Sequence, residues 1–185
     1  MTFTRRLAGF LSEGVSFDSV PPQVIAQSKE MMINAAAVGL TGAAQDHGRT
    51  LAALFQDMGG HGKCTIIGMG LRTSPVNAAL VNGLLVHLLD FDDEIRSYGG
   101  IITHPTAVVF PAVMALAELN GNSGREVLTA FALGCETAAK LDLWSPSSHL
   151  PGVPRPFSGG MAGAMGAAAA AGVLLGLAQE QMETA

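Results

Sequence analysis

The chain is organised around residues Ala78–Pro105, which read AALVNGLLVHLLDFDDEIRSYGGIITHP. An apolar run up to Leu89 predicts a helix, and the segment that follows carries four acids: Asp90, Asp92, Asp93 and Glu94. The stretch ends at Thr103-His104-Pro105, where the proline can open a second helix. Buried helices rarely end in four acids unless the acids face a cleft. The pattern therefore predicts a helix, a loop and a helix, with carboxylates and an imidazole meeting at one pocket.

The four acids also allow a purely structural interpretation. They could form a solvated helix end, where their charge opposes the helix macrodipole. If instead the helix continues through them, His87, Asp90 and Glu94 stand at positions i, i+3 and i+7 and share one face. In that arrangement Asp93 adjoins the face and Asp92 points away from it.

Two chemistries fit such a face. Carboxylates with an imidazole could bind a divalent cation such as Mg²⁺, Mn²⁺ or Zn²⁺. Alternatively no metal is involved: Asp90 orients a substrate or fixes the tautomer of an imidazole, and His104 moves a proton, as histidine does readily near neutral pH. Arg96 and Arg155 could each hold a substrate carboxylate by a bidentate contact, although a solvent-exposed arginine needs no such role.

The composition predicts one close-packed domain. The 185 residues are 49% hydrophobic and 14% charged, with 23 glycines, which argues against disorder. A formal net charge of −5 gives no electrostatic reason to expect nucleic acid.

Cys64 and Cys135 form no CxxC pair, so a cytoplasmic location is expected. The uncharged segment Phe157–Ala178 is long enough to cross a bilayer, but its alanines and glycines favour a buried helix in a soluble core.

Apolar periodicity predicts an all-α fold, a bundle of about seven helices. Helices are expected to begin near residues 3, 22, 50, 75, 105, 123 and 157. Ser123 and Glu126 form a capping box, and Pro111 should kink or restart the helix that contains it. Cys64–Ile67 is the one convincing strand signal, so we expect at most one short hairpin.

Several segments together resemble the MmgE/PrpD family, which includes 2-methylcitrate dehydratase and cis-aconitate decarboxylase. The signature residues are Val81-Asn82-Gly83, His87, Asp90-Phe91-Asp92-Asp93 and Thr103-His104-Pro105. The resemblance continues, in the same order, through Phe110–Glu118, Ser123–Leu128, Gly134–Leu141 and Gly166–Leu177. It covers most of the chain.

The resemblance implies a lyase or isomerase that needs no cofactor or metal and acts on a small polycarboxylate such as 2-methylcitrate or cis-aconitate. The chemistry would be proton transfer next to a carboxylate, with loss of water or CO₂ or with epimerisation. By position, His104 matches the family's catalytic histidine and Asp90 its pocket aspartate. The residues expected to bind substrate are Asp93, Glu94, Arg96 and Arg155.

Three departures from the family pattern qualify this reading. Glu94-Ile95 stands where the family usually has Thr-His, and the loop to His104 is longer. A second family histidine would fall at Phe157-Ser158, and His149, the nearest candidate, has the wrong spacing. Family members are also more than twice as long, so residues 1–185 would be the N-terminal portion of the helical domain, without the family's α+β domain.

These departures leave an alternative to catalysis. The chain could be a truncated, non-catalytic helical module that serves association. A helical domain cut short would expose apolar surface, which predicts a homodimer or other self-association, with no nucleic-acid or membrane partner. A metal-dependent all-α enzyme is a third class, which the family resemblance disfavours.

Overall fold

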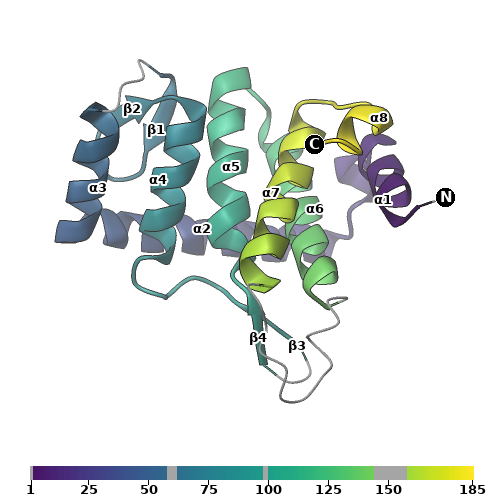
Figure 1. Ribbon diagram of the computed structural model, residues 1–185, viewed down its shortest axis with the longest axis horizontal. Coiled ribbons are helices and arrows are strands. Elements are labelled where there is room, and N and C mark those ends of the chain that lie inside the picture. Colours follow the sequence, from purple (N-terminus) through teal and green to yellow (C-terminus); the bar gives the residue numbers. More distant parts are fainter. Residues whose placement is uncertain (1, 58–61, 98–99, 144–157) are drawn as a thin grey trace.

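The computed structural model describes residues 2–57, 62–97, 100–143 and 158–185 (Figure 1). Within these ranges the predicted all-α class is confirmed, with eight α-helices rather than seven. They are α1 (Phe3–Ser12), α2 (Pro22–Ala43), α3 (Asp46–Asp57), α4 (Pro75–His87), α5 (Pro105–Asn120), α6 (Gly124–Leu143), α7 (Ser158–Leu174) and α8 (Gln179–Met182), with a 3-10 turn at Phe17–Ser19.

The long helix α2 lies across the back of the upright helices (Figure 1). It contacts α3, α4, α5 and α6, while α4, α5 and α7 stand side by side in front of it and α6 packs against α7. The main core fills the space between these layers. Val109, Val113 and Phe131 are fully buried there, and each such side chain contributes about 1.5–3 kcal/mol relative to exposure.

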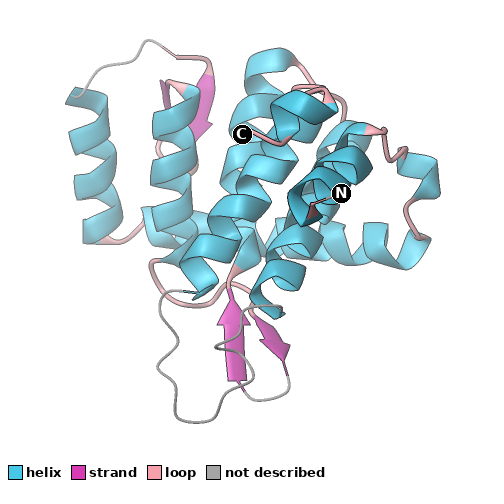
Figure 2. Cartoon of the chain, turned by 45° about the vertical axis from the view of Figure 1, so that its right-hand side comes forward, coloured by secondary structure: helices cyan, strands magenta, loops and turns pink. Residues whose placement is uncertain are grey.

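Two short antiparallel ribbons lie between successive helices of the chain (Figure 2). The ribbon of β1 (Cys64–Ile66) and β2 (Leu71–Thr73) is the predicted hairpin. The ribbon of β3 (Ile95–Ser97) and β4 (Gly100–Thr103) was expected to be loop, so the limit of one hairpin was too low. The chain on either side of Tyr98-Gly99 is rich in β-branched isoleucine, which favours strand pairing.

Asn82 anchors α4 to the first ribbon. Its side-chain oxygen accepts a hydrogen bond from the Ile67 N–H at 2.9 Å, and its amide donates to the Thr65 carbonyl at 2.8 Å. The side chain is buried, so both bonds form away from water, where an unpaired amide would be costly. This contact fixes the helix that ends at His87.

Helices α5 and α6 begin and end largely as their sequences indicate. Pro105 occupies the first turn of α5, and Gly121 ends the helix in a left-handed conformation with φ 74°. The helix runs without a break through Pro111, so it does not restart there. The capping box of α6 is confirmed: the Ser123 N–H donates to the Glu126 carboxylate at 2.7 Å, and the Glu126 N–H donates to Ser123 Oγ at 3.3 Å.

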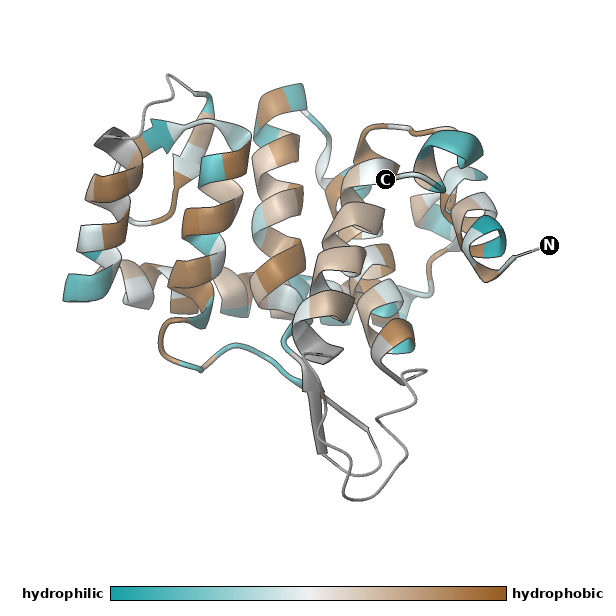
Figure 3. Cartoon of the chain, in the orientation of Figure 1, coloured by the Kyte–Doolittle hydropathy of each residue, from teal (hydrophilic) through white to brown (hydrophobic). Residues whose placement is uncertain are grey.

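The Ala/Gly-rich helix α7 is confirmed as part of the helical core. No helix in the described part of the chain is both long and apolar enough to span a membrane. Several large apolar side chains of α4 and α7 remain exposed, namely Val76, Leu80, Leu84, Met161 and Met165. Figure 3 shows that α4 is coloured mainly as hydrophobic. The expected self-association stays a prediction.

Small residues set the close approach of α6 and α7. A Cβ atom on Gly166 would lie 2.5 Å from the Gly134 carbonyl oxygen and 2.8 Å from Ala138 Cβ. A Cβ atom on Gly134 would in turn lie 2.8 Å from the Gly166 carbonyl oxygen. Neither position can therefore take a larger residue without moving one helix away from the other.

We predict that Gly166→Ala lowers the free energy of unfolding by about 1–3 kcal/mol, because the added methyl group overpacks the contact. Urea denaturation followed by circular dichroism measures the change. Gly160→Ala, on the same helix, is the matched control, because its Cβ would meet nothing within 4 Å. Equal effects of the two substitutions would contradict the account.

Candidate functional site

The acids after α4 leave the helix instead of extending it. The last helical residue is His87, and Asp90 adopts a left-handed conformation with φ 56°. Its N–H donates to the His87 carbonyl at 3.2 Å, which closes a turn. The prediction that His87, Asp90 and Glu94 share one helical face is therefore wrong. Aspartate is one of the few residues that tolerate this backbone conformation, so the chain can reverse here at small cost.

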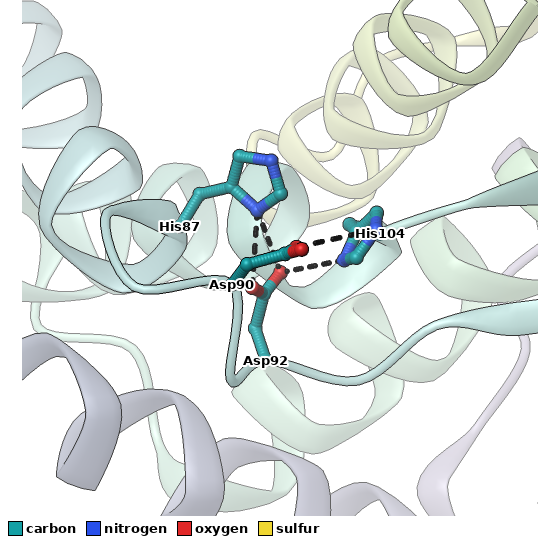
Figure 4. Close-up of side chains that lie close together, drawn as sticks. All are labelled: His87, Asp90, Asp92 and His104. Atoms are coloured by element: carbon teal, nitrogen blue, oxygen red, sulfur yellow. Dashed lines mark hydrogen bonds and ion pairs between the residues drawn. The ribbon is translucent and has the colours of Figure 1, made fainter.

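The turn brings Asp92 to the centre of the site. Its side chain has no exposed surface. One carboxylate oxygen lies 3.0 Å from His87 Nδ1, and the other lies 3.1 Å from His104 Nδ1 (Figure 4). The prediction that Asp92 points away is thus wrong, because it assumed an unbroken helix. A single buried carboxylate is shared by two imidazoles from different elements.

His104 contacts two carboxylates. It follows β4 directly and occupies the N-cap position of α5. Its Nε2 lies 3.9 Å from an oxygen of Asp90, which lies next to Asp92 beside the ring (Figure 4). The His104 side chain is 25% exposed, whereas that of Asp90 is 77% exposed. The rings of His87 and His104 meet edge to face, with centroids 4.7 Å apart.

These contacts assign a chemical role to each nitrogen. An ionised carboxylate only accepts hydrogen bonds, so the contact with Asp92 favours a hydrogen on Nδ1 of His104. The lone pair of the neutral ring is then on Nε2, which faces Asp90. The site can therefore present an imidazole nitrogen of fixed orientation that takes up or gives a proton.

Asp93 is held differently from its neighbours. Both carboxylate oxygens are buried and have no hydrogen-bond partner among the described residues. Burial raises the pKa of this carboxyl, and the charge of Asp92 adds to the rise. Thr106 and His104 oppose it, although the Thr106 hydroxyl lies outside hydrogen-bonding geometry. Burial also raises the pKa of the Cys135 thiol, with a further contribution from the charge of Asp93.

The structure describes fewer contacts for the other predicted substrate-binding residues. Glu94 is half-buried and follows Asp93 in the same loop. Arg96 belongs to β3, where its backbone pairs with Ile101 of the strand that leads to His104. Arg155 and His149 lie outside the described residues. The substrate contacts expected of Asp93, Glu94, Arg96 and Arg155 stay predictions.

An open groove adjoins the two imidazoles. It has a volume of about 590 Å³, and its walls come from α4, α5 and α7, with His87 and His104 at one end. Apolar residues make up most of the lining, including Leu80, Leu84 and Val108. A hollow of about 670 Å³ between α1 and α6 is larger, but it contains none of these carboxylates or imidazoles. The groove beside the histidines is therefore the candidate substrate site.

Comparison with known proteins agrees with this geometry. The family model described as the MmgE/PrpD N-terminal domain matches residues 5–185. The chain belongs to the MmgE/PrpD family. Its relatives include cis-aconitate decarboxylase of Mus musculus, 30% identical over 180 residues, and the cis-aconitate decarboxylase-like protein oryM of Aspergillus oryzae, 29% identical over 196 residues. Cis-aconitate decarboxylase of Aspergillus terreus is 25% identical over 186 residues.

These matches cover nearly all of this chain but a minor part of each relative. The matched region is 94% of this chain and 36% of the mouse protein, and 98% of this chain and 38% of the Aspergillus oryzae protein. The chain thus spans a little over a third of the length of the curated relatives. Asp92 is the residue of this candidate site that could not be predicted from the sequence.

The unpaired Asp93 carboxyl gives a pH-dependent prediction. Because the pKa of this carboxyl is raised in the folded state, the unfolded chain loses the proton first as the pH rises. Folding stability therefore falls as the pH rises from the pKa of the unfolded state to that of the folded state. We expect Asp93→Asn to be more stable than the parent chain at neutral pH. The difference should shrink as the pH drops below the normal range of an aspartate.

Urea denaturation of both chains at acidic and neutral pH measures this effect. A difference that stays constant between the two pH values would contradict the assignment. So would a variant that is less stable than the parent at neutral pH.

Proposed function

We propose that the protein is a cofactor-independent lyase that acts on a small polycarboxylate of the cis-aconitate class. Membership of the MmgE/PrpD family and the names of the relatives support the reaction class. The observation that carries the proposal is the hydrogen bond between Asp92 and Nδ1 of His104, at 3.1 Å. It leaves Nε2 as the proton-transfer atom of a residue that lines the groove.

In the proposed reaction His104 acts as acid or base. For decarboxylation, one carboxylate leaves as CO₂, and the electron pair left on carbon takes up a proton from the protonated Nε2. For dehydration, the neutral Nε2 removes a proton from the carbon next to a carboxylate and then gives this proton to the departing hydroxyl, which leaves as water. Such proton transfer is worth about 10²–10⁴-fold in rate. Asp92 acts throughout by orienting the ring, as a carboxylate does for the histidine of other acid–base sites.

Asp90 has a different part in this proposal. It lies 3.9 Å from Nε2 and is largely exposed, so it borders the space that a substrate would enter. Its negative charge would repel a substrate carboxylate unless a cation offsets it.

Arg96 is the nearest candidate for that cation in sequence and topology. The ribbon β3–β4 carries it on the strand paired with the one that ends at Thr103, one residue before His104. An arginine at this position could hold a carboxylate by two parallel hydrogen bonds. Arg155 would supply a second such contact. We propose these two residues as the substrate's carboxylate partners.

The decisive variants are His104→Ala and Asp92→Asn, made in the protein at its native length. We predict that His104→Ala lowers kcat on the productive polycarboxylate by about 10²–10⁴-fold, because it removes the proton-transfer group. Asp92→Asn should lower kcat more than it raises KM, because the amide favours the wrong tautomer of His104. Steady-state kinetics on a panel of tricarboxylates and 2-hydroxy acids measures both.

His47→Ala is the matched control, because it removes an exposed imidazole of α3 outside the site. It should retain full activity. All variants should keep their helical circular dichroism. Unchanged turnover in His104→Ala would remove the catalytic assignment, and absence of turnover in the parent protein on every substrate would favour the non-catalytic alternative.

A further inference from the structure

The four side chains of the site also form a set of metal ligands. His87, Asp90, Asp92 and His104 can each direct one nitrogen or oxygen atom so that all four atoms lie within 4.8 Å of one another. Two imidazoles and two carboxylates are ligands that suit zinc and similar transition metals better than Mg²⁺ or Ca²⁺, which prefer oxygen alone. The proposed reaction uses the same groups without a metal.

The separations are close to those of a tetrahedral site. Zinc bonds of about 2.0–2.2 Å place neighbouring ligand atoms about 3.3–3.5 Å apart. His87 Nδ1 and His104 Nδ1 lie 3.2 and 3.1 Å from the same oxygen of Asp92, so these two pairs need to open by only a few tenths of an ångström. Asp90 can place one oxygen within 4.8 Å of a ligand atom from each of the other three residues, and its exposed side chain would turn inward to complete the set.

Burial and exposure also suit a metal that arrives from solvent. Asp92 has no exposed surface and already contacts both imidazoles, so its position is fixed before an ion binds. His87 and Asp90 are 51% and 77% exposed, so their side chains can adjust around an incoming ion. The two carboxylates supply the charge that neutralises a divalent cation.

We propose that these four residues form a Zn²⁺-binding site whose occupation excludes proton transfer by His104. A bound ion takes the place of the hydrogens between Asp92 and the imidazoles, and each neutral ring then carries its hydrogen on the other nitrogen. It also holds a ring nitrogen of His104 and the carboxylate that orients the ring. Zinc would therefore inhibit the protein reversibly, a consequence that rests on the proposed function, whereas the binding itself does not.

Binding is tested on the whole chain without any substrate. Zn²⁺ is titrated calorimetrically, and Co²⁺ is used as a coloured substitute whose visible absorption reports tetrahedral coordination. We expect one ion per chain. His87→Ala and Asp90→Asn, both at exposed positions, should weaken binding by at least about tenfold, since even residues that only orient metal ligands are worth about 10–100-fold in affinity. His47→Ala should bind as the parent does.

The outcomes separate this inference from the proposed function. No Zn²⁺ binding, or binding that His87→Ala and Asp90→Asn leave unchanged, overturns the metal site whether or not the protein is active. Zinc binding that requires these residues supports the site even if no polycarboxylate is turned over. In an active protein, Zn²⁺ should abolish turnover and a chelator should restore it, and full activity with the site occupied would overturn the inhibitory role.

Discussion

The site depends on one buried carboxylate. Asp92 has no exposed surface, and burial of an unpaired carboxylate would cost several kcal/mol. The contacts with His87 and His104 offset that cost, and in return they fix both rings. Because His87 ends α4 and His104 precedes α5, the same carboxylate ties together the two helices that border the groove. Removing it would free both imidazoles at once.

The rest of the fold supplies the positions that Asp92 connects. Asn82 fixes α4 to the first ribbon, and α2 supports α4, α5 and α6 from behind. The contact between Gly134 and Gly166 lets α7 lie close to α6 and form the third wall of the groove. Strand β4 of the second ribbon ends directly before His104 and so positions its backbone. Each of these features acts on the site through the placement of the backbone.

Much of this fold could be predicted from the sequence because helix signals are local. Apolar spacing, Pro105 in a first turn and the pairing of Ser123 with Glu126 all act within a few residues, and the structure confirms them. The family resemblance, carried by the segments around Asn82, Asp90 and His104, is confirmed as well.

The missed features have a common cause. Nothing in the sequence marks Asp90 as the residue that reverses the chain, since aspartate is also compatible with a helix. Extending the helix by a few residues was enough to put Glu94 in the site and Asp92 outside it. The second ribbon was missed for a related reason, because strands of three or four residues carry little periodicity. Asp93, whose sequence neighbours are also acids, differs from the buried Asp92 because its carboxylate oxygens have no hydrogen-bond partner among the described residues.

The central claim is that Asp92 holds His104 with its hydrogen on Nδ1. The most direct measurement is the nitrogen-15 NMR spectrum of the His104 ring in the chain with a neutral imidazole, beside the same spectrum for Asp92→Asn. The account predicts a protonated Nδ1 and an unprotonated Nε2 in the parent chain, with loss of that preference in the variant. A hydrogen on Nε2 in the parent chain, or the same tautomer in both chains, would contradict it.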